Sequence, residues 1–179
     1  KLDRAMGDVH SGGNPHIHTD PRNIALVADA LAKRMAQIDS VNASAYAQRH
    51  DAFAKRWREA IGRWEREAAP LKSMMVVQQH AYYDYLWRWL GISVVGSLEP
   101  KPGVEATVAH MAQLVSQQQS QPAKMVVRGS YNDARAAAWF AERAKVPVVS
   151  LPATVGGTPE AKDLFAYFDD ILRRLLNPG

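Results

Sequence analysis

The stretch SMMVVQQHAYYDYLWRWLGISVVGSL, residues 73–98, contains two short apolar runs with an aromatic-rich segment between them. Short valine- and isoleucine-containing runs are typical of buried strands. The segment between them repeats its aromatic residues at helical spacing, and Gly91 provides the usual end of a helix. This order of strand, helix and strand is typical of a unit whose two strands lie parallel in one sheet.

The same alternation continues to the end of the chain. AKMVVRG (123–129) and VPVVSLP (146–152) predict two more buried strands, with helices over 103–119, 132–145 and from about Pro159 to Leu176. Four buried strands alternating with helices predict an α/β fold. We therefore expect a four-stranded parallel sheet, flanked by helices on both faces and joined by right-handed crossovers, over residues 70–179.

Two helices are predicted before this α/β unit. Asp20 is a natural N-cap and Pro21 suits the first helical position, so one helix begins there and ends near Asp39. A second helix runs from about Asn42 to Ala68 and spans roughly 40 Å. The chain therefore divides into residues 1–41, a connecting helix over 42–69, and the α/β unit over 70–179.

Composition excludes several classes of function. The 22 basic and 18 acidic residues give a formal charge of +4 without a dense basic cluster, which argues against binding of nucleic acid. Cysteine is absent, so disulfides, thiolate metal sites and cysteine nucleophiles are excluded. No run approaches the roughly 20 apolar residues of a membrane span. The sequence contains no secretory signal and opens without a methionine, so we expect a processed or truncated chain, for which the absence of a signal says little about export.

Histidines mark the candidate site. Ligands of open α/β sheets bind at the carboxyl ends of the strands, where His80 follows the first predicted strand. The loop SGGNPHIHTDPRN (11–23) places His16 and His18 just before a helix, whose N-terminus does not favour cations. Neutral imidazoles are common metal ligands. His80, His16, His18 and His10 are therefore candidate metal ligands, while a capping or core role for His80 and a solvated loop for the other three remain the alternatives.

Three segments resemble a known family of metal receptors. GNPHIHTDPRN (13–23), DSVNASAYAQRHDAF (39–53) and VVQQHAYYDYLWRWLGISVVGSLEPKPG (76–103) are similar to the ZnuA-like solute-binding proteins of bacterial zinc and manganese ABC importers. Pro15, His16 and the pair Asp20-Pro21 match the Pro-His and Asp-Pro pattern of that family. His80 matches its histidine after the first strand of the second lobe, so the resemblance implies that His16 and His80 are metal ligands, which His10 or His18 could join. The similarity extends from about residue 7 to the C-terminus.

The resemblance implies a fold and a function. Members have two α/β lobes joined by one long rigid helix, and they hold the metal between the lobes. Residues 1–41 would then be the end of the N-terminal lobe, and most of that lobe, with another histidine ligand, would precede Lys1. The implied function is a high-affinity zinc receptor, not an enzyme, that delivers the metal to a membrane permease. It would be periplasmic, or extracytoplasmic and lipid-anchored in a Gram-positive bacterium.

The ligand set departs from the family pattern at two positions. Many members carry an aromatic residue in place of His18. Many also carry an aspartate ligand after the last strand, where this chain reads SLPATVGG (150–157), so the fourth ligand is not assigned. A histidine-dominated site favours Zn²⁺ over Mn²⁺, with tetrahedral ligation at about 2.0 to 2.1 Å.

Two alternatives remain open. A zinc-dependent hydrolase would use the same histidines and would need a general base such as Glu99 or Asp84. A non-metal α/β binding module would make the histidines incidental. If the chain is a receptor that lacks one lobe, its lobe-facing surface is expected to promote self-association.

Overall fold

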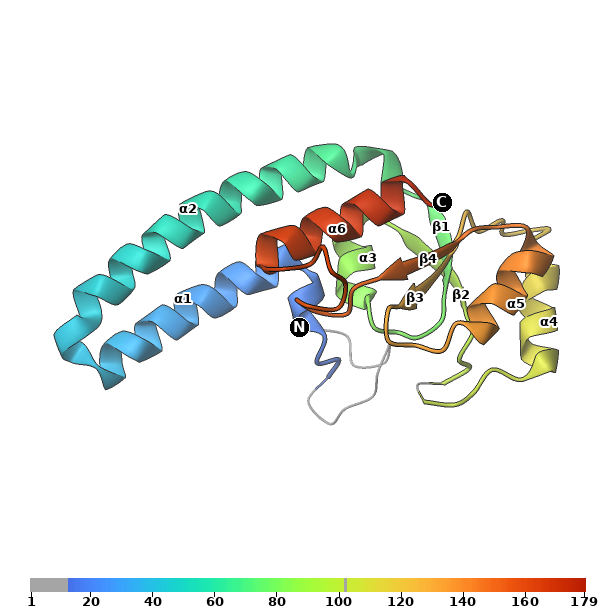
Figure 1. The fold of residues 1–179 in the computed structure, drawn as a ribbon, viewed down its shortest axis with the longest axis horizontal. Coiled ribbons are helices and arrows are strands. Elements are labelled where there is room, and N and C mark those ends of the chain that lie inside the picture. Colours follow the sequence, from blue (N-terminus) through green and yellow to red (C-terminus); the bar gives the residue numbers. More distant parts are fainter. Residues whose placement is uncertain (1–12, 102) are drawn as a thin grey trace.

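Four parallel strands form one sheet in the computed structural model, which describes residues 13–101 and 103–179 (Figure 1). The strand order is β2-β1-β3-β4, and every neighbouring pair is parallel. The strands are β1 (Met75–Gln78), β2 (Ser93–Ser97), β3 (Val126–Gly129) and β4 (Val148–Leu151). The predicted α/β fold with a four-stranded parallel sheet is confirmed.

Helices cover both faces of this sheet, α3 and α6 on one face and α4 and α5 on the other (Figure 1). The helices are α3 (Asp84–Leu90), α4 (Val108–Gln117), α5 (Arg135–Ala144) and α6 (Leu164–Leu176). Successive strand residues point to opposite faces, so Val76 packs in the core below α3 and α6 while Val77 packs below α4 and α5. The two-sided burial explains why the strands are short continuous apolar runs.

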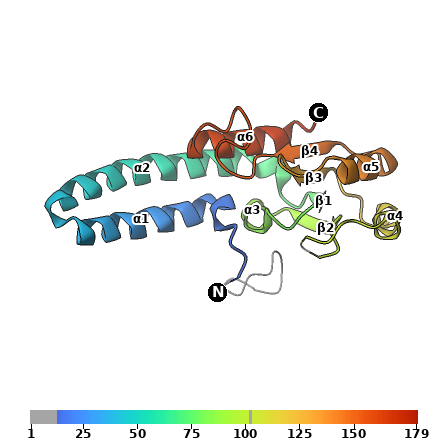
Figure 2. The same ribbon diagram turned by 60° about the horizontal axis from the view of Figure 1, so that its bottom comes forward.

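A pair of long helices extends away from the sheet (Figure 2). They are α1 (Pro21–Ile38) and α2 (Ala43–Glu67), joined by the short 3₁₀ helix Ser40–Asn42. The predicted cap is present, because the Asp20 side chain accepts a hydrogen bond from the Arg22 backbone N–H at 2.8 Å. The buried Trp57 of α2 donates its indole N–H to the Pro21 carbonyl at 2.8 Å. This bond fixes the start of α1, and with it the preceding loop, against the body of the protein.

The last helix begins later than its sequence pattern predicts. We expect it from about Pro159, but α6 starts at Leu164. The Asp163 carboxylate accepts hydrogen bonds from the Phe165 and Ala166 backbone N–H groups and caps the helix there. The residues between β4 and Asp163 form a loop without a helix or strand.

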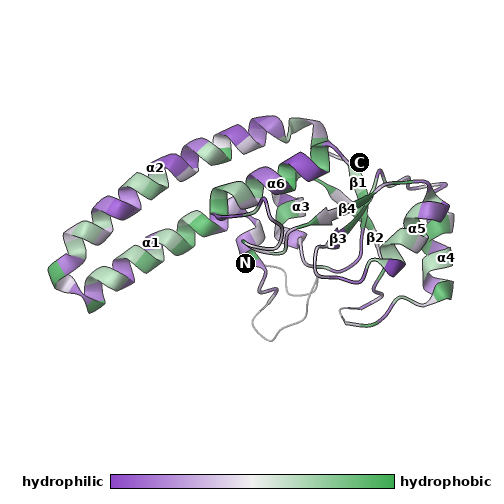
Figure 3. Ribbon diagram, viewed as in Figure 1, coloured by the Kyte–Doolittle hydropathy of each residue, from purple (hydrophilic) through white to green (hydrophobic). Residues whose placement is uncertain are grey.

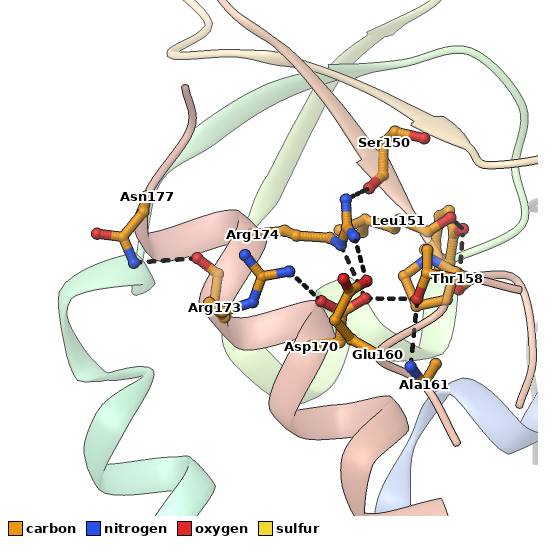
Figure 4. A network of polar contacts seen from close by, with 11 residues as sticks. Ser150, Leu151, Thr158, Glu160, Ala161, Asp170, Arg173, Arg174 and Asn177 are labelled. Atoms are coloured by element: carbon orange, nitrogen blue, oxygen red, sulfur yellow. Dashed lines mark hydrogen bonds and ion pairs between the residues drawn. The ribbon is translucent and has the colours of Figure 1, made fainter. Parts of the chain in front are cut away.

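A buried ionic network holds that loop against α6 (Figure 4). Asp170 is 2% exposed and accepts hydrogen bonds from the Thr158 hydroxyl at 2.7 Å and the Arg174 Nε at 2.8 Å, and a further one from Arg173. Arg174 also contacts Glu160 of the loop at 3.0 Å and the Ser150 carbonyl of β4 at 3.3 Å. The network therefore joins the loop, the last strand and the last helix.

Replacement of Asp170 with asparagine is expected to lower the free energy of unfolding by about 2–3 kcal/mol at pH 7. Burial acts to raise the pKa of Asp170, but hydrogen bonds from Thr158, Arg174 and Arg173 outweigh burial and lower it. The native carboxylate thus contributes stability above the unfolded-state pKa near 4, and that contribution is lost as the pH falls through the lower native pKa.

Urea unfolding followed by circular dichroism measures this effect. The difference between wild type and D170N should shrink as the pH is lowered below about 4. D29N is the matched control, because Asp29 is an exposed partner of Lys33 and its loss should cost under about 0.5 kcal/mol. A D170N midpoint equal to that of D29N would exclude a stabilising role for the network.

Candidate metal centre

The structure brings His16 and His80 together at the carboxyl edge of the sheet. His80 lies two residues past the end of β1, and His16 caps the 3₁₀ helix Ile17–Thr19 that precedes α1. Their ring centroids are 6.5 Å apart, with the planes nearly perpendicular. The Tyr82 ring packs on His16 with a centroid separation of 3.9 Å. Two segments that are far apart in sequence thus form one half-buried histidine pair.

The orientation of His80 is set by Glu99, which follows β2. The His80 Nδ1 lies 2.7 Å from the Glu99 Oε2, and the backbone N–H of Gly103 donates to the same oxygen at 2.9 Å. Because a carboxylate accepts, Nδ1 carries the proton, and in the neutral ring the lone pair is on Nε2. A carboxylate behind the imidazole is the common arrangement for a metal-ligating histidine.

His16 is oriented in the same way by an amide. Its Nδ1 lies 2.8 Å from the Asn14 side-chain oxygen, which also accepts the His16 backbone N–H at 3.0 Å. The Asn14 NH₂ group donates to the Asp84 carboxylate at 3.2 Å, and Tyr85 donates to the Asn14 carbonyl at 2.7 Å. Burial raises the pKa of Asp84, although the Asn14 bond opposes that effect. The lone pair of neutral His16 is therefore also on Nε2.

His18 points to a different partner. Its Nε2 lies 3.0 Å from the Ala153 carbonyl, in the loop after β4, so this nitrogen donates. The Tyr82 hydroxyl donates to the same carbonyl at 2.8 Å and lies 3.1 Å from the His18 Nε2. Burial, with a smaller effect of Tyr131, raises the pKa of Tyr82 to about 12 and keeps this hydroxyl a donor. His18 thus ties the histidine loop to the loop after β4.

The described residues do not by themselves complete a metal site. Within residues 13–101 and 103–179, no group of three or more histidine, aspartate or glutamate side chains is placed to hold a metal ion. Two imidazoles on one tetrahedral zinc would have centroids roughly 5 Å apart, given Zn–N distances of about 2.0–2.1 Å. The rings would therefore have to approach each other by about 1.5 Å. The candidate ligand His10 lies outside the described residues.

Sequence reasoning missed the residues that orient the histidines. Glu99 and Asp84 were considered as general bases of a hydrolase, but both accept hydrogen bonds in the support of the histidine pair. The adjacent β1 and β2 end at the same edge, so the nearness of Glu99 to His80 could have been inferred. No pattern in the sequence indicated the role of Asn14.

No helix in the described part of the chain has the length and apolar character needed to cross a bilayer.

Comparison with solved structures identifies the fold. A laminin-binding adhesin, Lmb, from Streptococcus agalactiae superimposes with a TM-score of 0.76 at 19% identity, covering 98% of this chain and 67% of that chain. A structure described as ZnuA superimposes with a TM-score of 0.80 at 18% identity, and the match covers 94% of this chain and 62% of that chain. The solute-binding protein FpvC from Pseudomonas aeruginosa, in complex with Ni²⁺, superimposes with a TM-score of 0.74 at 22% identity. That match covers 93% of this chain and 64% of that chain. The chain thus spans about two thirds of the length of these proteins.

Comparison of the sequence with models of known families shows to which family the chain belongs. Among curated proteins no match was found. The sequence model of the ZnuA family, described as zinc-uptake complex component A, periplasmic, matches residues 2–177. That match covers nearly the whole chain and agrees with the resemblance carried by the histidine motifs. The chain belongs to the ZnuA family.

Proposed function

We propose that this chain forms the larger part of an extracytoplasmic receptor that binds zinc and delivers it to the permease of an ABC importer. The observation that carries the proposal is the pair His16 and His80, whose Nδ1 atoms are both held by acceptors. This arrangement leaves each neutral ring with its lone pair on Nε2, the atom that would bind the metal. Capture and release require no bond-making, so we expect no catalysis.

The domain organisation follows from the same proposal. Residues 1–41 would end the first lobe, 42–69 would form the connecting helix, and 70–179 would form the second lobe. The chain spans 62–67% of the three proteins compared above, so further ligands would come from the part of the receptor that this chain does not include. That location of the other ligands is consistent with an incomplete site here.

Histidine ligation favours zinc as the cargo. Imidazole suits zinc, copper and nickel, whereas manganese prefers carboxylate and water oxygens. The loop after β4 offers no carboxylate near the pair, because Ala153 stands there and its carbonyl is already bonded to His18 and Tyr82. Structures of the similar FpvC are described with Ni²⁺ and with Mn²⁺, so the choice of metal must be measured for this receptor.

Competition calorimetry on the longest receptor that contains this chain tests the proposal. Zinc is expected to bind at least 100-fold more tightly than manganese at pH 7, and the 179-residue chain alone should bind zinc more weakly than the longer receptor. Zinc-loaded protein should hydrolyse neither p-nitrophenyl acetate nor p-nitrophenyl phosphate. Manganese preference would overturn the assignment of cargo, and zinc-dependent turnover would favour the hydrolase.

Self-association is a separate expectation for the 179-residue chain. Along α1 and the turn that follows, six apolar side chains are 39–93% exposed, and hydrophobic residues recur along this helix in Figure 3. They are Leu26, Val27, Leu31, Met35, Ile38 and Val41. In the proposed receptor the first lobe would cover this face. Without that cover, a second copy of the chain can bury it.

Sedimentation velocity checks this expectation. The 179-residue chain should form dimers at a concentration of tens of micromolar, and the double variant L31E/I38E should be monomeric. V104E is the matched control, since Val104 is similarly exposed but lies in the loop before α4. A wild-type chain that stays monomeric, or dimers that survive the double substitution, would contradict the expectation.

A further inference from the structure

A cleft lies at the carboxyl edge of the sheet and includes Glu99, the residue that contacts His80. It has a volume of about 500 Å³ and is enclosed by the ends of β1, β2 and β3 and by the first turns of α4 and α5. Its lining includes Gln79, Glu99, Glu105, Met111, Asp133 and Trp139. Since β2 and β3 lie on opposite sides of β1, the chain changes winding direction here, and such switch points are where open α/β sheets bind ligands.

One lining residue carries a polar atom without a partner. Gln79 is 7% exposed, and its side-chain NH₂ group donates to the Asp133 carbonyl at 3.0 Å. Its side-chain oxygen is buried and accepts no hydrogen bond in the described part of the chain. The bond to a carbonyl fixes which end of the amide is the donor, so the unpartnered atom is an acceptor. A buried acceptor of this kind requires an N–H or O–H donor from elsewhere.

The charge of the lining favours a cationic donor. Three carboxylates, from Glu99, Glu105 and Asp133, are opposed by one guanidinium, from Arg135, which pairs with Asp133 at 2.8 Å. This acidic balance contrasts with the formal charge of +4 of the whole chain. Apart from Gln79 and Asn132, the remaining lining residues are apolar and include the buried Met111 and the half-buried Trp139.

We propose that this cleft binds an organic ammonium compound. The ammonium group would be stabilised by Glu99 and Glu105, and it would donate to the Gln79 side-chain oxygen after a small rotation of that amide exposes the oxygen to the cleft. The apolar body would pack against Met111 and Trp139. The volume lies within the usual range for small-molecule sites, about 300–1,000 Å³. The cleft shares Glu99 with the histidine pair, but binding of the amine requires no metal ion.

The probe for the test is 2-phenylethylamine, and 3-phenylpropionate is its anionic counterpart of similar size. Titration of the ¹⁵N-labelled chain should move the backbone amide signals of Val108, Asn132 and Ala136, which line the cleft, with the amine and not with the carboxylate. Q79L should weaken amine binding at least 10-fold, and E105Q should weaken it about threefold. Gln113 is exposed on α4 outside the cleft, so Q113L should bind as wild type does.

E105Q keeps the test valid if Q79L fails to fold, because Glu105 is exposed and outside the core. Absence of amine binding, equal binding of 3-phenylpropionate, or wild-type affinity in both folded variants would overturn the proposal. Zinc affinity plays no part in these outcomes. Failure of the ammonium site is therefore distinguishable from failure of the proposed metal-receptor function.

Discussion

Replacement of His80 with alanine is expected to reduce zinc affinity at least 100-fold in the proposed receptor. The substitution removes one of the proposed ligands and leaves Glu99, which accepts the hydrogen bond of the His80 Nδ1, without that partner. H16A should have an effect of the same size, since the proposed ligands act on one ion. A 100-fold loss corresponds to about 2.7 kcal/mol. Competition with a chelator of known zinc affinity provides the measurement.

A graded series separates ligation from orientation. E99Q keeps an acceptor for the His80 Nδ1 but removes its charge, so zinc affinity should fall about 10-fold. H110A should leave the affinity unchanged, because His110 lies on α4 and contacts the Ser97 carbonyl at 2.8 Å. If H80A bound zinc as tightly as H110A, His80 would not be a ligand.

Replacement of Trp57 with alanine is expected to lower the free energy of unfolding by about 3–5 kcal/mol, the largest stability effect considered for this chain. Trp57 is 1% exposed, and its ring lies 5.2 Å from Trp64 and 4.9 Å from Phe165, measured between centroids. Alanine would leave a large cavity between α2 and α6 and would also remove the hydrogen bond to Pro21.

Guanidinium unfolding followed by far-UV circular dichroism measures the loss. W57F retains much of the packing but not the indole N–H, so it should cost about 1–2 kcal/mol. W139A is the control for loss of an indole, because Trp139 is half-buried at the surface of α5, and its cost should be about 1 kcal/mol. Equal midpoints for W57A and W139A would contradict the central packing role of Trp57.

The sequence predicts the sheet well because the strands are buried on both faces. Their apolar runs are short and continuous, and turn residues such as Gly91, which has a positive φ of 66°, separate them from the helices. The start of α6 was missed because a proline at 159 suits a first helical turn, whereas the Asp163 side chain caps the backbone four residues later. Local propensity does not decide between two such signals.

The candidate site was predictable only in part. Strand order places His80 at the ligand-binding edge, but the bond from His80 to Glu99 depends on side-chain rotamers that no local pattern specifies. The alternation of His16 and His18 left both in question. The structure separates them, because the 3₁₀ turn directs one ring toward Asn14 and the other toward the Ala153 carbonyl.

The most direct test of the metal centre is long-range ¹H–¹⁵N NMR of the histidine side chains, recorded with and without zinc. We expect zinc to shift the Nε2 signals of His16 and His80, while Nδ1 of both rings stays protonated and the His18 and His110 signals stay in place. Unchanged His16 and His80 signals in zinc-saturated protein would contradict the assignment of these two residues as the metal ligands.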